Sequence, residues 1–272
     1  MMRELAELLA RLPQAPAALV TVVRSAGSVP RELGAWLAVF GDGVVLGTIG
    51  GGHLELEAIE RARAALAAGP FEPEERRCAL GPSLGQCCGG VVWLRQERIE
   101  AAHIEALRTR LMPATRPLAL FGGGHVGRAI VRLLEELPFA VRWVDSRDEV
   151  FPAVLPLNVQ AEHSDPVQAA VAELPAGSAV LVMSFSHAED LEVIAACLAR
   201  QRERGDLSHI GLIGSRTKWA RFGHRLAERG FSQAELARVN CPIGLPEIRG
   251  KQPAVVALAV VAELLALGLA PG

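Results

Sequence analysis

Tyrosine is absent from this 272-residue sequence, and aromatic residues make up only 4% of it. Without tyrosine, a dehydrogenase mechanism that depends on a tyrosine–lysine pair is excluded. An excess of charge of one sign is also absent, because 28 lysines and arginines nearly balance 30 aspartates and glutamates, for a formal net charge of -2. No long run of like charge occurs, so neither nucleic acid nor an anionic membrane surface is a predicted partner.

Cysteine is scarce, and hydrophobic runs long enough for a membrane span are missing. The five cysteines are scattered along the chain, so reduced thiols are expected rather than a disulfide framework. The N-terminus lacks the apolar core and cleavage site of a signal peptide. The longest apolar stretch, residues 253–269, carries Glu263 and is too short and alanine-rich for a confident span. We therefore expect a cytoplasmic protein.

The first half of the chain predicts an N-terminal α/β domain over residues 1–112. Half of all residues are apolar, which is enough for a sizeable core. A helix is expected over 54–68, where Gly69 and Pro70 stop it. Residues 112–117 contain two prolines and are the predicted linker. Strands are expected at 19–23, 36–40, 44–47 and 90–94, with a short helix at 103–111.

The second half, residues 117–272, alternates strands and helices regularly. This alternation predicts a doubly wound parallel sheet of the Rossmann type, covered by helices on both faces. Strands are expected at 118–121, 140–144, 158–161, 179–183 and 209–213, and helices at 126–137, 191–202 and 217–228, with a last helix from residue 253.

A glycine-rich turn follows the first strand of this domain. Gly122, Gly124 and Gly127 fit the G-x-G-x-x-G pattern between a strand and a helix, where free N–H groups favour a pyrophosphate. Asp145 ends the next strand at the spacing required to accept from ribose hydroxyls. Arg147 follows closely and would suit a 2′-phosphate. The pattern predicts the fold, and leaves open whether NAD(P) or another nucleotide binds.

Two further strand-to-helix loops carry polar side chains. His187 and Asp190 could form an acid/base pair or bind a metal, although Asp190 is equally placed to cap a helix that begins at residue 191. Ser215 and Arg216 lie at a turn that suits an anionic ligand, and the alternative is that the serine caps the helix and the arginine is solvated.

The first domain has its own glycine loop, Gly50–Gly52, followed by His53. It lacks the lysine and hydroxyl ending of a P-loop, so a nucleoside triphosphatase is not predicted. Three successive glycines indicate the close approach of a ligand or of another backbone. Upstream, Arg24 and Arg31 flank a serine- and glycine-containing turn that is typical of a phosphate or carboxylate clamp, although surface arginines give the same pattern.

Cys87 and Cys88 stand together in the glycine-rich stretch Gly81–Gly90. A thiolate here could bind a soft metal, carry sulfur as a persulfide or act as a nucleophile, while the alternative is a pair of small buried residues. No C-x-x-C spacing accompanies the pair, so a closed structural zinc site is not expected.

Taken together and in order, these segments resemble the xanthine dehydrogenase accessory proteins, the XdhC/CoxI family. The matching segments cover nearly the whole chain and run over Val23–Arg31, Gly47–Glu55, Gly81–Gly90, Phe121–Gly127, Trp143–Arg147, Gly211–Lys218, Cys241–Leu245 and Gly250–Ala254.

The resemblance implies a cofactor-binding chaperone rather than an ordinary catalyst. Family members bind molybdenum cofactor (molybdopterin), hold it while a cysteine desulfurase helps to replace an oxo ligand by sulfido, and deliver it to an apo xanthine dehydrogenase type enzyme. On this basis the cofactor would be faced by Arg24, Arg31, the 50–53 loop and one of the two adjacent thiols, Cys87 or Cys88. That thiol could contact the molybdenum. Cys88 matches the family's general pattern, and Cys87 its xanthine dehydrogenase branch. We also expect a homodimer.

Two other functions stay open at the level of sequence. A dinucleotide-dependent oxidoreductase would use the glycine turn at 122–127 and Asp145, with His187 as acid/base. A redox or metal sensor would use the adjacent thiols.

Overall fold

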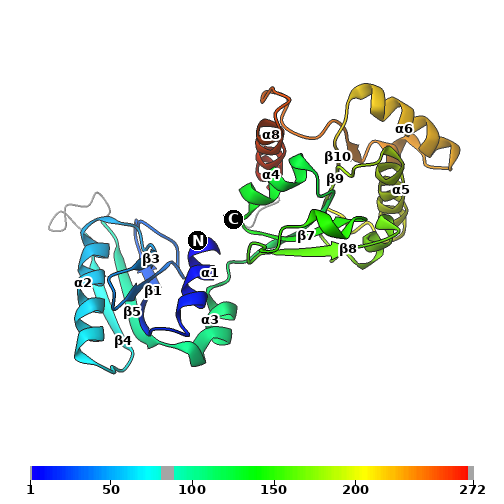
Figure 1. The fold of residues 1–272 in the computed structure, drawn as a ribbon. Coiled ribbons are helices and arrows are strands. Elements are labelled where there is room, and N and C mark those ends of the chain that lie inside the picture. Colours follow the sequence, from blue (N-terminus) through cyan, green and yellow to red (C-terminus); the bar gives the residue numbers. More distant parts are fainter. Residues whose placement is uncertain (1, 81–88, 269–272) are drawn as a thin grey trace. The chain divides into compact units, whose positions relative to one another are not determined.

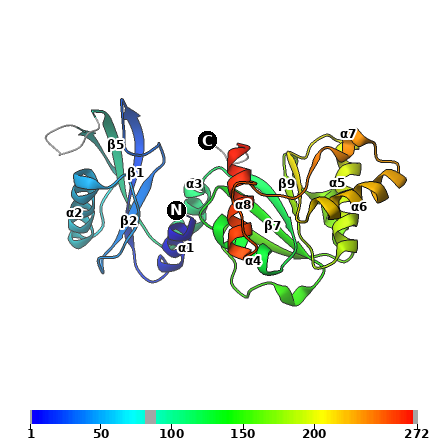
Figure 2. The same ribbon diagram turned by 90° about the horizontal axis from the view of Figure 1, so that it is seen from above.

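The computed structural model describes residues 2–80 and 89–268. The chain divides between Met112 and Pro113 into two compact units, here named unit 1 and unit 2 (Figures 1 and 2). Each unit has its own sheet and its own buried core.

Unit 1 is built on a five-stranded antiparallel sheet in the order β3-β2-β1-β5-β4. Its elements in chain order are α1 (Met2–Arg11), β1 (Ala17–Ala26), β2 (Trp36–Phe40), β3 (Val45–Gly47), α2 (Gly52–Ala68), β4 (Glu74–Ala79), β5 (Val91–Ile99), a 3₁₀ turn (Ala101–His103) and α3 (Ile104–Leu111).

Side chains of β1 alternate between the two faces of this sheet, as strand geometry requires. Ala18, Val20 and Val22 share one buried cluster with Leu54 and Ala58 of α2. Figure 1 shows α2 on this face, and α1 and α3 on the opposite one. The sheet therefore has an α2 face and an α1 face.

Strand β4 was not predicted from the sequence. Four of its six residues are charged, and all but Arg76 and Cys78 are exposed. An edge strand has a neighbour on only one side, so it does not need the apolar run by which strands are recognised.

Unit 2 has a six-stranded parallel sheet in the order β11-β10-β9-β6-β7-β8. Its elements are β6 (Arg116–Phe121), α4 (His125–Leu134), β7 (Phe139–Asp145), a 3₁₀ turn (Asp148–Val150), β8 (Val159–His163), a 3₁₀ helix (Val167–Glu173), β9 (Ala179–Val182), α5 (His187–Glu203), β10 (His209–Leu212), α6 (Arg216–Glu228), α7 (Gln233–Leu236), β11 (Val239–Asn240) and α8 (Pro253–Ala266).

Helices cover both faces of this sheet. Leu118 and Leu120 of β6 pack in one cluster with residues of α4 and α8, whereas Ala119 and Phe121 pack in another with residues of α5 and α6. The predicted Rossmann-like fold is thus confirmed, and the α/β class with it. No helix in the described part of the chain, α8 included, is long and apolar enough to cross a membrane.

The strand order reverses direction between β6 and β9, which lie side by side in the centre of the sheet. Chains that leave such neighbouring strands turn to opposite faces, and this opens a crevice beyond their carboxyl ends where open α/β sheets bind ligands. The glycine turn after β6 and the loop of residues 183–186 after β9 both start at this edge.

Candidate functional site

Arg24 lies near the end of β1, Arg31 lies in the loop that follows, and the two arginines have different environments. Arg24 is 63% exposed and lies 3.4 Å from Glu75, and its guanidinium carbon is 4.9 Å from the centre of the Trp93 ring. Arg31 pairs with Glu32 at 2.7 Å. The hydrogen bond between them raises the pKa of Arg31 and lowers the pKa of Glu32 to about 2. Of the two arginines, Arg24 is the more accessible.

The turn of this loop packs directly on the backbone at Gly90. A side chain at Gly90 would collide with the carbonyl oxygens of Ala26 and Ser28, and one at Gly27 would lie 3.1 Å from the Gly90 Cα atom. The Leu80 N–H donates to the Gly90 carbonyl at 2.8 Å. Glycine is required at Gly90 because two backbone segments meet there without space for a side chain.

The glycine loop before α2 packs on the same segment. A Cβ atom at Gly50 would lie 2.5 Å from Cβ of Pro30, and Gly50 has a φ of +123°. Gly51 and Gly52 also have positive φ, and a Cβ atom at Gly51 would meet nothing within 4 Å. The predicted close approach at Gly50 is thus made by the Pro30 ring, whereas Gly51 presents an open surface beside the exposed His53.

Glu55 holds the glycine loop in place. One of its carboxylate oxygens accepts hydrogen bonds from Thr48 Oγ1 at 2.6 Å, Ile49 N at 2.9 Å and Gly51 N at 3.1 Å. Burial raises the pKa of Glu55, but these hydrogen bonds outweigh it and the pKa lies below its ordinary value. The carboxylate occupies N–H groups of the loop that an anionic ligand would otherwise use.

Three segments that are far apart in the sequence therefore meet at one end of the unit 1 sheet. They are residues 24–31, 48–53 and 89–90, here named the three-loop site. Cys87 and Cys88 lie outside the described residues, but the flanking Leu80 and Gly90 are hydrogen-bonded to each other at this site. The ends of the thiol-bearing segment are anchored there.

The three cysteines in the described part of the chain are poor nucleophiles. Cys197 is fully buried, and desolvation raises its pKa to about 12. Burial also raises the pKa of Cys78 and of Cys241. All three fit the structural role predicted for them. Among the described residues, no group of three or more histidine, cysteine, aspartate or glutamate side chains could hold a metal ion.

In unit 2, the glycines of the 122–127 turn have separate roles. A side chain at Gly122 would collide with the Met183 carbonyl, and one at Gly127 would collide with the Gly122 carbonyl. These two glycines let β6, β9 and α4 pack closely. Gly124 meets nothing within 4 Å and is the N-cap of α4 without a side-chain cap, so the start of this helix is open to an anion.

Asp145 is buried, and its carboxylate is fully engaged. It accepts from Gly123 N at 2.6 Å and from Arg147 through the backbone N–H, Nε and Nη2, each at 2.9 Å. Burial raises the pKa of Asp145, but these hydrogen bonds outweigh it and keep the pKa below its ordinary value. The Arg147 guanidinium also lies 4.4 Å from the ring centre of Phe185. A ribose would have to displace Arg147 before Asp145 could accept from it.

The prediction that Asp190 could cap a helix from residue 191 is wrong. Helix α5 begins at His187, and its N-cap is Ser186, which accepts from Ala188 N. The apolar periodicity starts only at Leu191, which is why the polar first turn was assigned to the loop.

Asp190 instead joins the loop before α5 to the first turn of α6. One carboxylate oxygen accepts from Ser184 N at 2.8 Å, and the other pairs with Lys218 at 2.6 Å. Lys218 also donates to the Ile213 carbonyl at 2.8 Å. His187 is exposed, with its ring centre 6.3 Å from that of Phe222. Because Asp190 is satisfied by these partners, its geometry gives no support to an acid/base pair with His187.

Ser215 and Arg216 follow the simpler of the two interpretations. The Ser215 side chain accepts from Lys218 N and is the N-cap of α6. Arg216 is exposed at the first position of that helix. The hydroxyl is thus used in capping.

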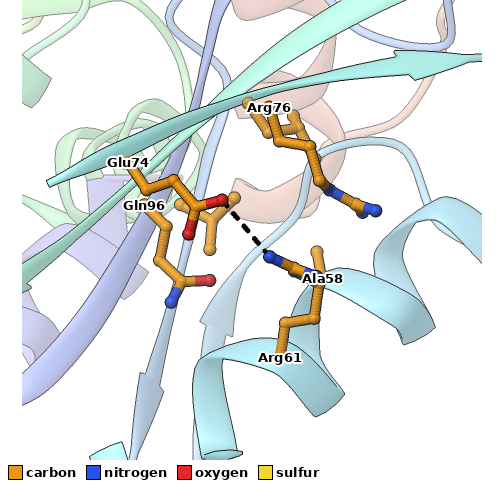
Figure 3. Close-up of a pocket in the computed structure, with 7 residues that line it drawn as sticks. Ala58, Arg61, Glu74, Arg76 and Gln96 are labelled. Carbon is orange, nitrogen blue, oxygen red and sulfur yellow. Dashed lines mark hydrogen bonds and ion pairs between the residues drawn. The ribbon is translucent and has the colours of Figure 1, made fainter. Parts of the chain in front are cut away.

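A small cavity lies on the α2 face of the unit 1 sheet (Figure 3). Its volume of about 20 Å³ has room for roughly one water molecule. Charged side chains at its rim are paired, with Arg61 3.5 Å from Glu74 and Arg76 2.6 Å from Glu57. This cavity is too small for a cofactor.

The sequence indicated which loops carry these polar side chains, but not which groups the side chains contact. A glutamate in the first turn of a helix that lacks a polar N-cap is a recognisable signal, so the inward role of Glu55 could have been found. The pairing of Asp190 with Lys218 joins residues 28 apart and has no local signal.

Comparison with known proteins identifies both units. The XdhC Rossmann domain matches residues 118–264, and the XdhC and CoxI family matches residues 10–75. An Escherichia coli (strain K12) protein described as uncharacterized protein YqeB is 30% identical over 260 residues, which are 92% of this chain and 43% of that protein. The chain thus spans less than half the length of this relative.

The fold recurs in a solved structure. A Bacillus halodurans protein described as a xanthine dehydrogenase superposes with a TM-score of 0.69, covering 97% of this chain and 95% of that one, at 18% sequence identity. At this level of identity, the likeness shows a common fold.

Proposed function

The chain belongs to the XdhC and CoxI family, which implies a role in molybdoenzyme maturation, and from this premise we propose that it is a molybdenum cofactor chaperone. It binds and protects the cofactor, supports its sulfuration with a cysteine desulfurase, and inserts it into an apo xanthine dehydrogenase type enzyme. The cofactor is the cargo of the protein and not a resident group.

The convergence of the three-loop site carries this proposal. Gly90 packs on Ser28, and Gly50 packs on Pro30, so two loops lie against the segment between Arg24 and Arg31. This brings guanidinium groups, an open glycine backbone and the ends of the thiol-bearing segment to one end of a single sheet.

The chemistry of these groups suits the parts of a molybdopterin. Arg24 is exposed and cationic, as recognition of the phosphate requires. The open surface at Gly51 admits a flat ring without a side-chain clash. A thiolate of Cys87 or Cys88 is a soft ligand of the kind that a molybdenum–dithiolene centre accepts.

The competing function, an NAD(P)-dependent oxidoreductase, rests on the Rossmann-like fold of unit 2 and on the open helix start at Gly124. Against it stands the engagement of Asp145 by Arg147, which occupies both carboxylate oxygens that a ribose diol would use. The chaperone function is therefore favoured.

Titration with molybdopterin released from a purified molybdoenzyme tests the proposal. We expect saturable binding to the full-length chain, and at least tenfold weaker binding in Cys87→Ala or Cys88→Ala. Cys241→Ala is the matched control, because this thiol lies in unit 2, and it should bind as the unaltered protein does. A second readout is the activity that an apo xanthine dehydrogenase type enzyme regains.

Absence of binding to the unaltered chain would overturn the proposal. Equal binding by both thiol variants would remove the cysteines from the site and leave the arginines and the glycine loop. Analytical ultracentrifugation with and without cofactor measures whether the chaperone is the homodimer that we propose.

A further inference from the structure

An arginine, a tryptophan and a second arginine form one row across the unit 1 sheet. Trp93 of β5 pairs with Arg24 of β1 on one side and with Arg77 of β4 on the other. The guanidinium carbons of these arginines lie 4.9 Å and 6.0 Å from the centre of a Trp93 ring. The three side chains therefore form one continuous aromatic and cationic surface, here named the Trp93 row.

The Trp93 row lies on the α1 face of the sheet. Its neighbours along the strands, Cys78 and Val92, belong to the buried cluster that includes residues of α2. Successive side chains of a strand point to opposite faces, so Arg77 and Trp93 point away from α2. Arg24 shares their face because its guanidinium lies over the Trp93 ring.

Charge on this face is poorly balanced. The next row pairs Arg95 with Glu75, yet the one ion pair found for Glu75 in the described residues is the 3.4 Å contact with Arg24. The two side chains of that pair are 63% and 45% exposed, so solvent screens it strongly. Arg77 and Arg95 have no ion pair with a described residue. On the α2 face, by contrast, Arg61 pairs with Glu74 (Figure 3) and Arg76 pairs with Glu57.

The row next to the Trp93 row has unfilled hydrogen-bonding capacity. Trp36 and Arg95 both pair with Thr21, and each of these three side chains has a buried polar atom without a hydrogen-bond partner in the described residues. Trp36 is 1% exposed. Such groups are rare in proteins, and three in one row make this part of the sheet unusually polar for its burial.

We infer that the Trp93 row is a binding platform for a flat heterocycle that carries a phosphate. The pterin of the cargo is the occupant to which the inference is committed, so it rests on the proposed function. Trp93 lies three residues beyond Gly90, about 10 Å along the strand from that glycine, and Arg24 belongs both to the Trp93 row and to the three-loop site. The platform thus continues from the segment whose ends anchor the thiols.

The contacts define how such a ligand would bind. Arg77 is at the outer limit of a cation–π contact with Trp93, so its guanidinium leaves the ring at little cost. The heterocycle then stacks on the indole, and the guanidinium groups of Arg77 and Arg24 donate to the phosphate. Guanidinium groups recognise phosphate by paired N–H donors, and an indole stacks with any planar ring.

Neopterin monophosphate is the probe for the test, and guanosine monophosphate and inorganic phosphate are the comparison ligands. With the full-length chain, we expect saturable binding of the pterin, measured by calorimetry, and none of inorganic phosphate at the same concentrations. Arg77→Gln and Trp93→Leu should each weaken binding by about tenfold, the scale of one charge-assisted or stacking contact. Arg61→Gln, an exposed arginine on the α2 face, should bind normally.

The outcomes separate this inference from the proposed function. Molybdopterin could bind Trp93→Leu and Arg77→Gln with the same affinity as the unaltered chain. In that case the inference about the Trp93 row is wrong, and the chaperone function stands. Binding of guanosine monophosphate without neopterin monophosphate would overturn the pterin assignment. Because Arg77 is exposed and has no ion pair with a described residue, Arg77→Gln is expected to fold normally even if Trp93→Leu does not.

Discussion

Replacing Glu55 by alanine is expected to release the glycine loop of the three-loop site. One carboxylate oxygen of Glu55 accepts from Thr48, Ile49 and Gly51, at distances between 2.6 and 3.1 Å. Without it, two backbone N–H groups and one hydroxyl lose their acceptor. Three successive glycines with positive φ have no side chains to keep the loop in a single conformation.

The expected loss of stability follows from these contacts. A hydrogen bond to a charged group contributes about 1.5–3 kcal/mol when it is buried. Glu55 is half-buried, so water replaces part of what is lost, and three bonds to one oxygen are not additive. We expect Glu55→Ala to destabilise unit 1 by about 2 kcal/mol. Glu60→Ala, an exposed glutamate of the same helix, is the matched control and should change stability by less than about 0.5 kcal/mol.

The loss should depend on pH in a defined direction. The pKa of Glu55 lies below its ordinary value in the folded state, so its stabilisation is complete above the unfolded pKa and disappears as the pH falls through the folded one. The difference between the unaltered protein and Glu55→Ala should therefore be constant from neutral pH down to about pH 5 and shrink below about pH 4.

Urea unfolding with hydrogen exchange of amides in β1 and β5 measures the stability of unit 1 separately from that of unit 2. The same experiment is repeated between pH 7 and pH 3. A difference that does not change over this range, or an alanine variant as stable as the control, would refute the proposed role of the carboxylate. Molybdopterin titration of the same variant then measures how far the loop contributes to binding.

Three further outcomes are expected. Gly90→Ala should lower the stability of unit 1 by about 2 kcal/mol through a backbone collision, whereas Gly89→Ala, with no atom within 4 Å of the new methyl group, should be nearly neutral in urea unfolding. Lys218→Met should cost about 3–5 kcal/mol because Asp190 is left buried and unpaired, and adding Asp190→Asn should recover part of the loss. Calorimetry with NAD should show no binding to the unaltered chain. Arg147→Ala should gain affinity for NAD, because the Asp145 carboxylate is then released from the guanidinium. Tight binding of NAD to the unaltered chain would contradict this expectation.

Most of unit 2 could be predicted from the sequence because its signals are local. The glycine pattern at 122–127 lies between an apolar strand and a helix. A side chain at Gly122 or Gly127 would collide with backbone atoms of neighbouring segments. Regular alternation of strands and helices predicts a parallel sheet with helices on both faces. The start of α5 was misplaced by four residues, since its first turn is polar and the Ser186 cap carries the only local signal.

Side-chain partners were harder to predict than positions. The spacing from the glycine turn predicts where Asp145 lies, but not that its carboxylate is engaged by Arg147. The conformation of that arginine is supported by Phe185, which stands on a different loop. Charged residues of β4 gave no strand signal, although Arg77 in this strand belongs to the Trp93 row.

By itself, the sequence determined where the backbone needs glycine, which segments alternate as strands and helices, and which residues are candidates for phosphate or thiol chemistry. Only the tertiary structure decided that residues 24–31, 48–53 and 89–90 form one site. In unit 1, β1 lies between β2 and β5, so strands separated by some 70 residues become neighbours. Such a pairing depends on burying both faces of the sheet at once, and no local pattern of residues encodes it.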